Sequence, residues 1–348
     1  MIIVYSFKND YSEGAHPQIL NQILKINAEQ NIGYGQDQYS ELAKELIKNI
    51  IAKKDAAIHF LVGGTQTNLT VMAAFLRPYE AVIAPHTGHI LVHETGAIES
   101  TGHKIISVAT TEGKLTTEQI LAVLKEHTDE HMVKPKMVYI SQPTEIGTIY
   151  SYAELNKISE LCKQKNLYFY IDGARLGSAL MSEKNDVNLA QIAQLTDAFY
   201  IGGTKNGALF GEALVICRQK LQTDFRYHIK QRGAMLAKGQ FLGVQFWEMF
   251  KAGLYYQLAE HANKMAKLLK MALQDLECEF LVNTDTNQIF PILSKRVIAS
   301  LEKKYSFYIW QEISEDCAAV RLVTSWATSE SVVQEFVADL KQLLSDAV

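Results

Sequence analysis

The chain has 348 residues, of which 48% are hydrophobic and 21% are charged, and its formal net charge at pH 7 is -4. The length suggests roughly two domains, and the composition is that of an ordinary globular enzyme. The net charge indicates no basic surface for nucleic acid. No stretch reaches the roughly 20 apolar residues of a membrane span. The cysteines are scattered, which favours neither a disulfide framework nor a zinc motif.

The N-terminal part of the chain contains no targeting signal that we can identify, so the cytoplasm is the expected location. Residues 17–30 have helical periodicity behind a first-turn proline. Further on, an apolar run ends in Gly63, Gly64 and Thr65 and leads into a helix-compatible segment over residues 68–77. Glycines let backbone N–H groups approach a phosphate, and a helix N-terminus adds a favourable field. The motif predicts a phosphate-binding loop, although a plain loop with a capping threonine also fits it.

Strand-like and helical segments alternate through the middle of the chain. The expected strands cover residues 81–84, 105–108, 137–141, 167–171, 198–201 and 213–217. The clearest helices between them cover residues 116–127 and 152–164. Such alternation is typical of a largely parallel sheet covered by helices on both faces. We therefore predict an α/β fold for this part of the chain.

Two of the predicted strands end in residues that suit one cofactor. The strand over residues 167–171 leads into Asp172, and the strand over residues 198–201 leads into Lys205. Pyridoxal phosphate (PLP) needs an amine to form a Schiff base with its aldehyde and a carboxylate to keep its ring nitrogen protonated. An ordinary Asp–Lys ion pair at a sheet edge is the alternative. Because the phosphate-binding loop precedes both strands, the order of the three features favours PLP.

The pattern changes after Gly239. Residues 241–276 form a long helical tract, and strand, helix, strand and helix follow to the end of the chain. We place the boundary near residues 239–253. The predicted large domain covers residues 1–245 with the N-terminal segment, and the predicted small C-terminal α/β domain covers residues 246–348.

With these motifs in place, the chain resembles fold-type I PLP enzymes of the threonine aldolase and β-eliminating lyase group. The most specific strings are Ile171-Asp172-Gly173-Ala174-Arg175 and Arg321-Leu322-Val323-Thr324. The other matching residues are Asn9-Asp10, Tyr34-Gly35, Gly63-Gly64-Thr65, His89 and Thr204-Lys205. The resemblance implies an aspartate aminotransferase-like large domain with a mostly parallel sheet, and a smaller C-terminal α/β domain.

The resemblance also implies roles for the residues that catalyse the reaction and hold the cofactor. Lys205 would form the Schiff base, Asp172 would face the pyridine nitrogen, and His89 would stack on the ring and accept a proton from the substrate. The cofactor would also contact Gly63, Gly64, Thr65, Arg175 and Thr204.

The residues implied for the substrate come from several segments. They are Asn9, Tyr34, Arg175 and Arg321. An arginine binds a carboxylate bidentately, and an amino-acid substrate carries one. Two of them have an alternative interpretation. Arg175 could be an arginine at the start of a helix that pairs with a surface acid, and Tyr34 could be an aromatic residue packed within a loop. The family's basic residue from a neighbouring subunit matches either Arg232 or Lys238.

A metal site is a rival interpretation of the histidines. His86, His89 and His93 would share one face if they lay on a helix, as in a zinc site. The sequence has no His-Glu-x-x-His core and no clear distant ligand, so we predict no metal.

The sequence and the resemblance together predict a PLP-dependent lyase acting on a small amino acid. The expected reaction is cleavage of the Cα–Cβ bond of L-threonine or L-allo-threonine to glycine and acetaldehyde. The alternatives are β-elimination or transamination of another small amino acid, or binding of PLP or a metal without turnover. The resemblance implies a homodimer or homotetramer, and the charge and composition predict that the protein binds neither nucleic acid nor membrane.

Overall fold

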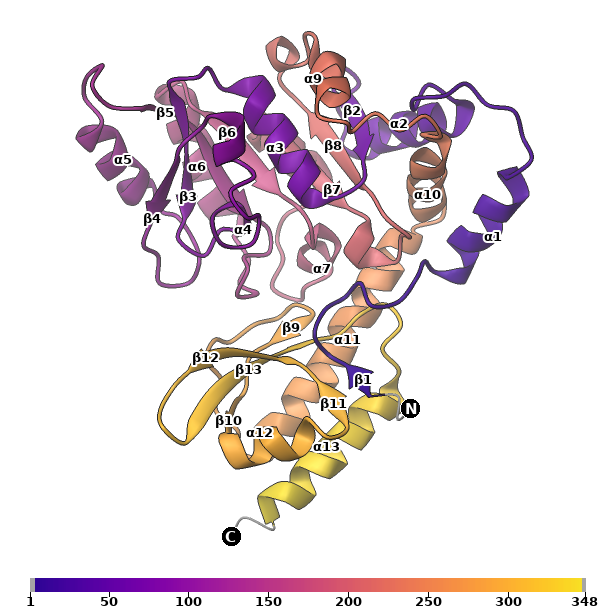
Figure 1. Ribbon diagram of the computed structural model, residues 1–348, viewed down its shortest axis with the longest axis vertical. Helices are drawn as coiled ribbons and strands as arrows, with labels where there is room; N and C mark the ends of the chain where they lie inside the picture. Colours follow the sequence, from indigo (N-terminus) through magenta and orange to yellow (C-terminus); the bar gives the residue numbers. More distant parts are fainter. Residues whose placement is uncertain (1–3, 346–348) are drawn as a thin grey trace.

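The computed structural model describes residues 4–345. Figure 1 shows a large lobe above a small lobe, with helix α11 (Leu254–Asp275) running from one into the other. Within the described residues, no helix combines the length and the apolar character that crossing a membrane requires.

A seven-stranded sheet lies at the centre of the large lobe. Its order is β2-β8-β7-β6-β5-β3-β4. All neighbouring pairs from β7 to β4 are parallel, whereas β8 runs antiparallel to both β2 and β7. The strand bounds are β2 Ala57–Leu61, β3 Glu80–Pro85, β4 Ile105–Val108, β5 Lys134–Ser141, β6 Tyr168–Asp172, β7 Ala198–Gly202 and β8 Glu212–Ile216.

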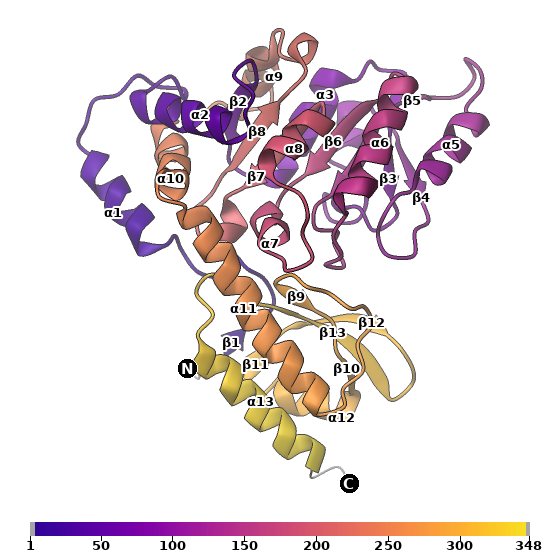
Figure 2. The same cartoon turned by 180° about the vertical axis from the view of Figure 1, so that it is seen from behind.

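Helices cover both faces of this sheet. Helices α3 and α9 lie in front of it in Figure 1, with the short helix α4 near its lower edge, and α6, α7 and α8 lie in front in the reverse view of Figure 2. Helices α1, α2 and α10 pack together beside β2. The bounds are α1 Pro17–Ile26, α2 Gln38–Ile50, α3 Gly64–Phe75, α4 His89–Val92, α5 Thr117–Glu126, α6 Tyr152–Gln164, α7 Leu176–Leu180, α8 Leu189–Leu195, α9 Phe225–Gln231 and α10 Gln240–Lys251.

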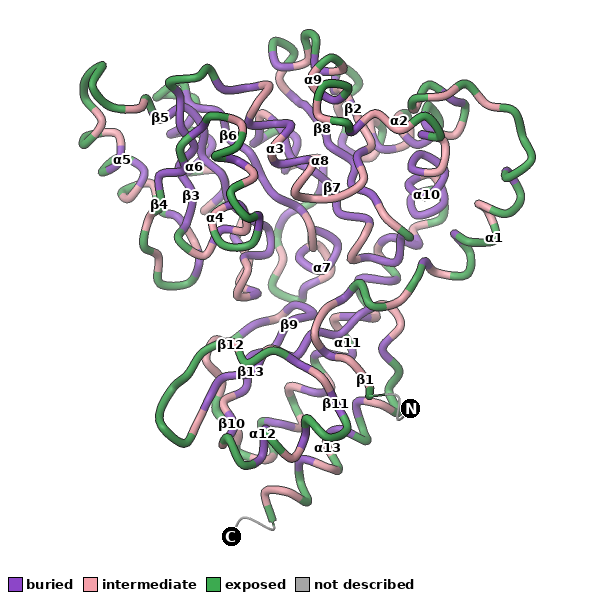
Figure 3. Tube along the Cα trace, in the orientation of Figure 1, coloured by how far each residue is buried: buried purple, intermediate pink, exposed green. Residues whose placement is uncertain are grey.

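The strands of the large lobe are apolar on both faces because each face packs against helices. Along β5, Val138 and Ile140 belong to the core on one face, whereas Met137 and Tyr139 belong to the core on the other. Figure 3 shows the resulting band of buried residues through the middle of the lobe. Side chains at the strand ends are therefore held by a rigid layer.

The small lobe has its own antiparallel sheet and apolar core. Strand β13 pairs with β10, β12 and β9, and helix α13 packs against α11 (Leu254–Asp275) and α12 beside them. The N-terminal strand β1 pairs in parallel with β11. The bounds are β1 Tyr5–Ser6, β9 Gln288–Ile289, β10 Ile292–Ser294, β11 Tyr305–Ser306, β12 Tyr308–Glu312, β13 Cys317–Val323, α12 Lys295–Leu301 and α13 Glu330–Ser345.

The predicted α/β fold with a mostly parallel sheet is confirmed, and each of the six predicted strands is present. Three helices differ from the prediction. The tract over residues 241–276 is two helices, because Gly253 adopts φ +74° and breaks the chain between α10 and α11. The helix expected at residue 68 begins at Gly64, and the helix expected over residues 17–30 ends at Ile26.

The predicted domain division at residue 245 stays a prediction. Two buried segments show which lobe the residues near the predicted domain limits pack against. Phe7 is fully buried in the core of the small lobe, so the N-terminal segment packs there. Phe250 and Leu258 belong to the core of the large lobe, which therefore extends into the first turns of α11.

Candidate active site

The polar residues that the sequence places at strand ends gather at one edge of the large sheet. Ser141 ends β5, Asp172 ends β6 and Lys205 follows β7. Because the carboxyl ends of parallel strands meet at the same edge, ligands of such sheets bind there. This edge carries α4 and α7 and faces the small lobe in Figure 1.

Asp172 is buried and held by four hydrogen-bond donors. Oδ1 accepts from the Tyr200 hydroxyl at 2.5 Å and from the Ala174 amide at 3.0 Å. Oδ2 accepts from the Tyr139 hydroxyl at 2.8 Å and from Asn68 Nδ2 at 3.0 Å. Burial raises the pKa of Asp172, but the electrostatic interaction with His89 and these hydrogen bonds outweigh it and hold the pKa below its usual value. The structure thus keeps an ionised carboxylate in an apolar layer.

Lys205 lies in a short 3-10 turn, Thr204–Asn206, directly after β7. Its side chain is half-buried, and Nζ lies 5.9 Å from the centre of the Tyr11 ring. Burial and the nearby charge of Arg175 lower its pKa, and the carboxylates of Asp10 and Asp172 act in the opposite direction. A lowered pKa increases the neutral fraction of the amine, which is the nucleophilic form.

Glu212 lies beside this lysine and was missed by the sequence analysis. It is the register partner of Gly202 across β7 and β8, and its Oε2 accepts the Gly203 amide at 3.0 Å. Burial raises the pKa of Glu212 to about 8, although a hydrogen bond with Thr204 and the charge of Lys205 act against the rise. The signal in the sequence is a lone acid at the start of the apolar run from residue 213 to residue 216.

Glu212 should make the stability of the protein depend on pH. A carboxyl whose folded pKa exceeds its unfolded value stabilises the fold at low pH, and this contribution is lost as pH rises from the unfolded pKa through the folded one. Glu212→Gln should therefore gain stability relative to the wild type between about pH 5 and about pH 8. Thermal melts at both pH values measure this, with the exposed Glu126→Gln as matched control. An equal difference in melting temperature at both pH values would contradict the assignment.

The predicted phosphate-binding loop forms the first turn of α3. Gly63 is the N-cap residue, it makes no side-chain capping bond, and open space surrounds the position where its Cβ would lie. A Cβ on Gly64 would lie 2.9 Å from the Tyr200 hydroxyl, so only glycine fits there. Thr65 follows within the first turn. The free amides of this turn point a positive field at the site edge.

His89 begins α4 and is oriented by two acids that the sequence analysis did not single out. Its Nδ1 lies 2.8 Å from Glu94 Oε1, and its backbone amide donates to Glu145 Oε1 at 2.9 Å. A carboxylate accepts, so Nδ1 carries the hydrogen and Nε2 is left as the acceptor nitrogen. Glu94 Oε1 also accepts from Asn68 Nδ2 at 2.7 Å, which links His89 to the partners of Asp172.

The histidines do not share a helix face, as the metal interpretation required. Helix α4 covers only His89–Val92, and His86 lies before it, where its Nδ1 accepts the Thr110 amide at 3.2 Å. Across residues 4–345, no three His, Cys, Asp or Glu side chains are arranged to hold a metal ion.

Arg175 is paired with an acid from the N-terminal segment. Its Nε and Nη2 donate to the two oxygens of Asp10 at 2.7 and 3.1 Å. Asp10 Oδ2 also accepts from Asn287 Nδ2 at 2.9 Å, so this ion pair joins the two lobes. The neighbouring Asn9 uses its Oδ1 to accept from Tyr11 and Ser12. Two of the three guanidinium nitrogens of Arg175 are thus already bound, and its predicted contacts to cofactor and substrate stay predictions.

Arg321 reaches the same place from β13 without a carboxylate partner. Its guanidinium carbon lies 5.3 Å from the Tyr308 ring centre and 5.0 Å from that of Trp310. Nη2 donates to the Lys8 carbonyl at 3.1 Å, and Nε is buried without a hydrogen-bond partner. Burial and the charge of Arg175 lower its pKa to about 10. No ion pair involves Arg321 among the residues that the structure describes.

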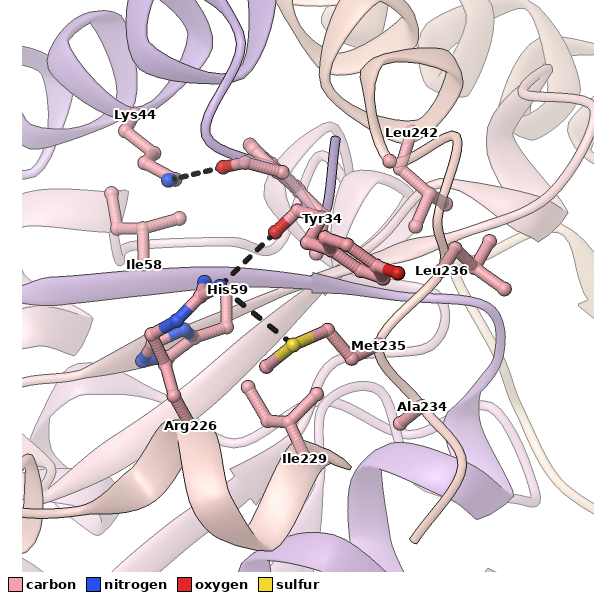
Figure 4. A pocket seen from close by; sticks show the side chains of 13 residues that line it. Tyr34, Lys44, Ile58, His59, Arg226, Ile229, Ala234, Met235, Leu236 and Leu242 are labelled. Carbon is pink, nitrogen blue, oxygen red and sulfur yellow. Dashed lines mark hydrogen bonds between the residues drawn. The ribbon is translucent and has the colours of Figure 1, made fainter. Parts of the chain in front are cut away.

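Tyr34 lies apart from these residues. Figure 4 shows it at a cavity of about 30 Å³ formed with His59, Arg226 and Met235, where Arg226 Nη2 donates to the Tyr34 carbonyl at 3.3 Å. Lys205, Asp172, His89 and Arg321 do not line this cavity. Arg232 and Lys238 are the two candidates for a contact to a neighbouring subunit. Arg232 has a buried Nε without a hydrogen-bond partner, and Lys238 is exposed.

Known proteins resemble this chain over most of its length. A model of the beta-eliminating lyase family matches residues 10–296. A low specificity L-threonine aldolase of a Pseudomonas species is 31% identical over 344 residues, which cover 97% of this chain and 98% of that protein. The corresponding enzyme of Escherichia coli K12 is 26% identical over 257 residues, 72% of this chain and 74% of that enzyme.

Solved structures give the same picture. A threonine aldolase of Leishmania major superimposes with a TM-score of 0.97 at 48% identity and covers 98% of this chain and 99% of that one. Aspartate aminotransferase of Thermus thermophilus superimposes with a TM-score of 0.73 at 13% identity, covering 98% of this chain and 92% of that one, and shows the shared fold alone. The predicted aspartate aminotransferase-like architecture is thereby confirmed.

Proposed function

The chain belongs to the beta-eliminating lyase family, and from this premise we propose that it is a PLP-dependent lyase that cleaves the Cα–Cβ bond of a small β-hydroxy-α-amino acid. The proposed substrates are L-threonine and L-allo-threonine, and the products are glycine and acetaldehyde. The names of the relatives support this choice, since they include L-threonine aldolases that match nearly the whole chain.

The residues at the sheet edge fit the proposed cofactor. The uncapped first turn of α3, with Gly63, Gly64 and Thr65, would hold the phosphate. Asp172, kept ionised by its donors, would hold the proton of the ring nitrogen, and Lys205 would hold the aldehyde carbon. When bound, PLP supplies the aldehyde that takes up the substrate amine and a ring that accepts the electron pair released at Cα.

The absence of a carboxylate partner for the guanidinium of Arg321, among the described residues, is the observation that carries the proposal for an amino-acid substrate. A buried N–H without an acceptor is costly, and a carboxylate bound bidentately would satisfy the Nε of Arg321. The rings of Trp310 and Tyr308 lie close to the guanidinium. Binding at Arg321 would orient the substrate, and His89 Nε2 is the free acceptor for the β-hydroxyl proton because Glu94 holds Nδ1.

The proposed reaction is tested by incubating the purified protein and PLP with a panel of amino acids. L-Threonine and L-allo-threonine should release acetaldehyde and glycine. Ammonia with pyruvate from L-serine, or a keto acid from L-alanine, would indicate elimination or transamination instead. No aldehyde from either threonine isomer would overturn the proposal.

Arg321→Ala should weaken substrate binding more than it slows chemistry. Losing one charged hydrogen-bonded contact of about 1.5–3 kcal/mol predicts a rise in KM of roughly 10- to 100-fold. Kinetics on L-threonine measure this, together with the absorbance of bound PLP, which should stay unchanged. Arg77→Ala serves as the matched control, because Arg77 is an exposed arginine at the opposite edge of the sheet. An unchanged KM would exclude Arg321 as the carboxylate site.

We also propose that the protein is cytoplasmic and works as a homodimer or homotetramer. The unpartnered Nε of Arg232 supports an additional contact at that face. Sedimentation at assay concentration tests the assembly, and a fully active monomer would contradict it.

A further inference from the structure

A row of hydroxyl groups connects Asp172 with a second buried acid, Glu145. The Tyr139 hydroxyl lies 2.8 Å from Asp172 Oδ2 and 3.2 Å from Ser141 Oγ. Ser141 Oγ in turn lies 2.5 Å from Glu145 Oε1. Ser141 and Asp172 are register partners on β5 and β6, so the row follows directly from the pairing of the strands.

A second route joins the same two acids on the other side. Glu145 Oε1 accepts the His89 amide, His89 Nδ1 contacts Glu94, and Asn68 Nδ2 lies within hydrogen-bond distance of both Glu94 and Asp172. The hydrogen bonds therefore close into a ring that contains the predicted cofactor-binding acid and the predicted proton acceptor. Glu145 is the point at which the hydroxyl row meets the backbone of α4.

The protons of the row can be counted. Its three contacts, Asp172–Tyr139, Tyr139–Ser141 and Ser141–Glu145, need one hydrogen each, and the two hydroxyl groups supply only two. The third must come from a carboxyl group at one end. Four donors already point at Asp172, whereas Glu145 Oε2 is buried with no partner at all. The missing hydrogen therefore belongs to Glu145.

We propose that Glu145 is a positioning residue that is held protonated, with its carboxylic hydrogen completing the donor row that ends on Asp172. In this state Glu145 donates to Ser141, Ser141 donates to Tyr139, and Tyr139 donates to Asp172, while Glu145 Oε1 still accepts the His89 amide. Loss of the hydrogen would leave Tyr139 and Ser141 facing each other without a donor and would place a second negative charge beside Asp172.

The charges around Glu145 agree with a neutral carboxyl. Burial raises its pKa, and the negative charge of Asp172 on β6 raises it further, whereas the hydrogen bonds that the ionised form would accept from Ser141 and from the His89 amide lower it. The buried hydroxyls of Tyr139 and Tyr150 and the guanidinium of Arg175 are further titratable groups that feel its charge. The neutral form removes like-charge repulsion between two buried acids.

Infrared difference spectra of the cofactor-free protein test the proton directly. The wild type minus the Glu145→Gln variant should show the carbonyl stretch of a protonated carboxylic acid, and raising the pH should abolish this difference. If the spectrum lacks that band at every pH at which the protein is folded, Glu145 is ionised and the proposal is wrong. This arm holds even if the proposed aldolase reaction fails, because it involves neither substrate nor turnover.

Kinetics then distinguish two roles of Glu145: donating a hydrogen to the row of hydroxyl groups, or only holding α4 through the His89 amide. This arm rests on the proposed function. Glu145→Gln keeps an acceptor for the His89 amide but cannot ionise. We expect kcat to fall about 2- to 10-fold, which is the cost of one hydrogen bond. In the wild type kcat should also decline with rising pH as Glu145 deprotonates, and in the variant this decline should be absent. Ser141→Ala interrupts the row without touching His89 and should give a similar fall in kcat with KM unchanged. Purely structural support predicts a Glu145→Gln variant with the wild-type kcat and pH profile, and that result would overturn the proposal.

Discussion

Replacement of Lys205 by alanine is expected to abolish the release of acetaldehyde from L-threonine, with turnover reduced by at least about 10⁴-fold. Lys205 lies after β7 at the same sheet edge as Asp172, and its lowered pKa favours the neutral amine. Among the described residues that approach Asp172, it supplies the primary amine that the chemistry requires. Removing the amine would remove the group that we propose to hold the aldehyde carbon of PLP.

A coupled assay for acetaldehyde measures the loss. Borohydride reduction followed by mass spectrometry should find a covalent PLP adduct on the peptide that contains Lys205 in the wild type and none in the variant. Lys303→Ala, an exposed lysine of the small lobe, serves as the matched control and should keep both activity and adduct. An adduct on another lysine in the wild type would remove Lys205 from this role.

Asp172→Asn is expected to lower turnover by roughly 10²- to 10³-fold, the usual scale for losing one preorganised electrostatic contact. An amide carries no negative charge, so it would hold the proton of the proposed ring nitrogen weakly. It also disturbs the site, because the amide nitrogen cannot accept from Tyr139 or Tyr200 as a carboxylate oxygen does. Both effects act on the electron sink, so kcat should fall much more than KM rises.

Asp197→Asn is a matched control for Asp172→Asn. Asp197 precedes β7 at the opposite edge of the sheet, where it accepts from the Phe169 amide at 2.8 Å and pairs with Arg218 at 3.0 Å. Its replacement should lower the melting temperature and leave turnover unchanged. Steady-state kinetics with L-threonine and thermal melts compare the two variants. Wild-type turnover in the Asp172→Asn variant would exclude Asp172 from the site.

The sequence located the strands because their signal is local. Buried parallel strands are short apolar runs, and a polar residue directly after such a run marks the sheet edge where ligands bind. Asp172, Lys205 and the loop of Gly63 and Gly64 could therefore be singled out by position alone. The break at Gly253 was missed because helical periodicity continues on both sides of it.

The partners of these residues could not be predicted from local patterns. Asn68 and Asp172 are separated by 104 positions and Arg175 and Asp10 by 165. Glu94, Glu145 and Glu212 stand alone in their segments, and a single acid has no periodicity that distinguishes a buried partner from a solvated side chain.

By itself, the sequence determined the α/β fold, the order of its strands along the chain and the residues that end them, since each depends on neighbours a few positions away. Only the tertiary structure decided which charged side chains already have a partner of opposite charge. Arg175 and Arg321 are the same residue type in equally specific motifs, yet the fold pairs Arg175 with Asp10 and leaves Arg321 without a carboxylate. That difference arises from the packing of the N-terminal segment between the lobes, which places Asp10 against Arg175 and Asn287.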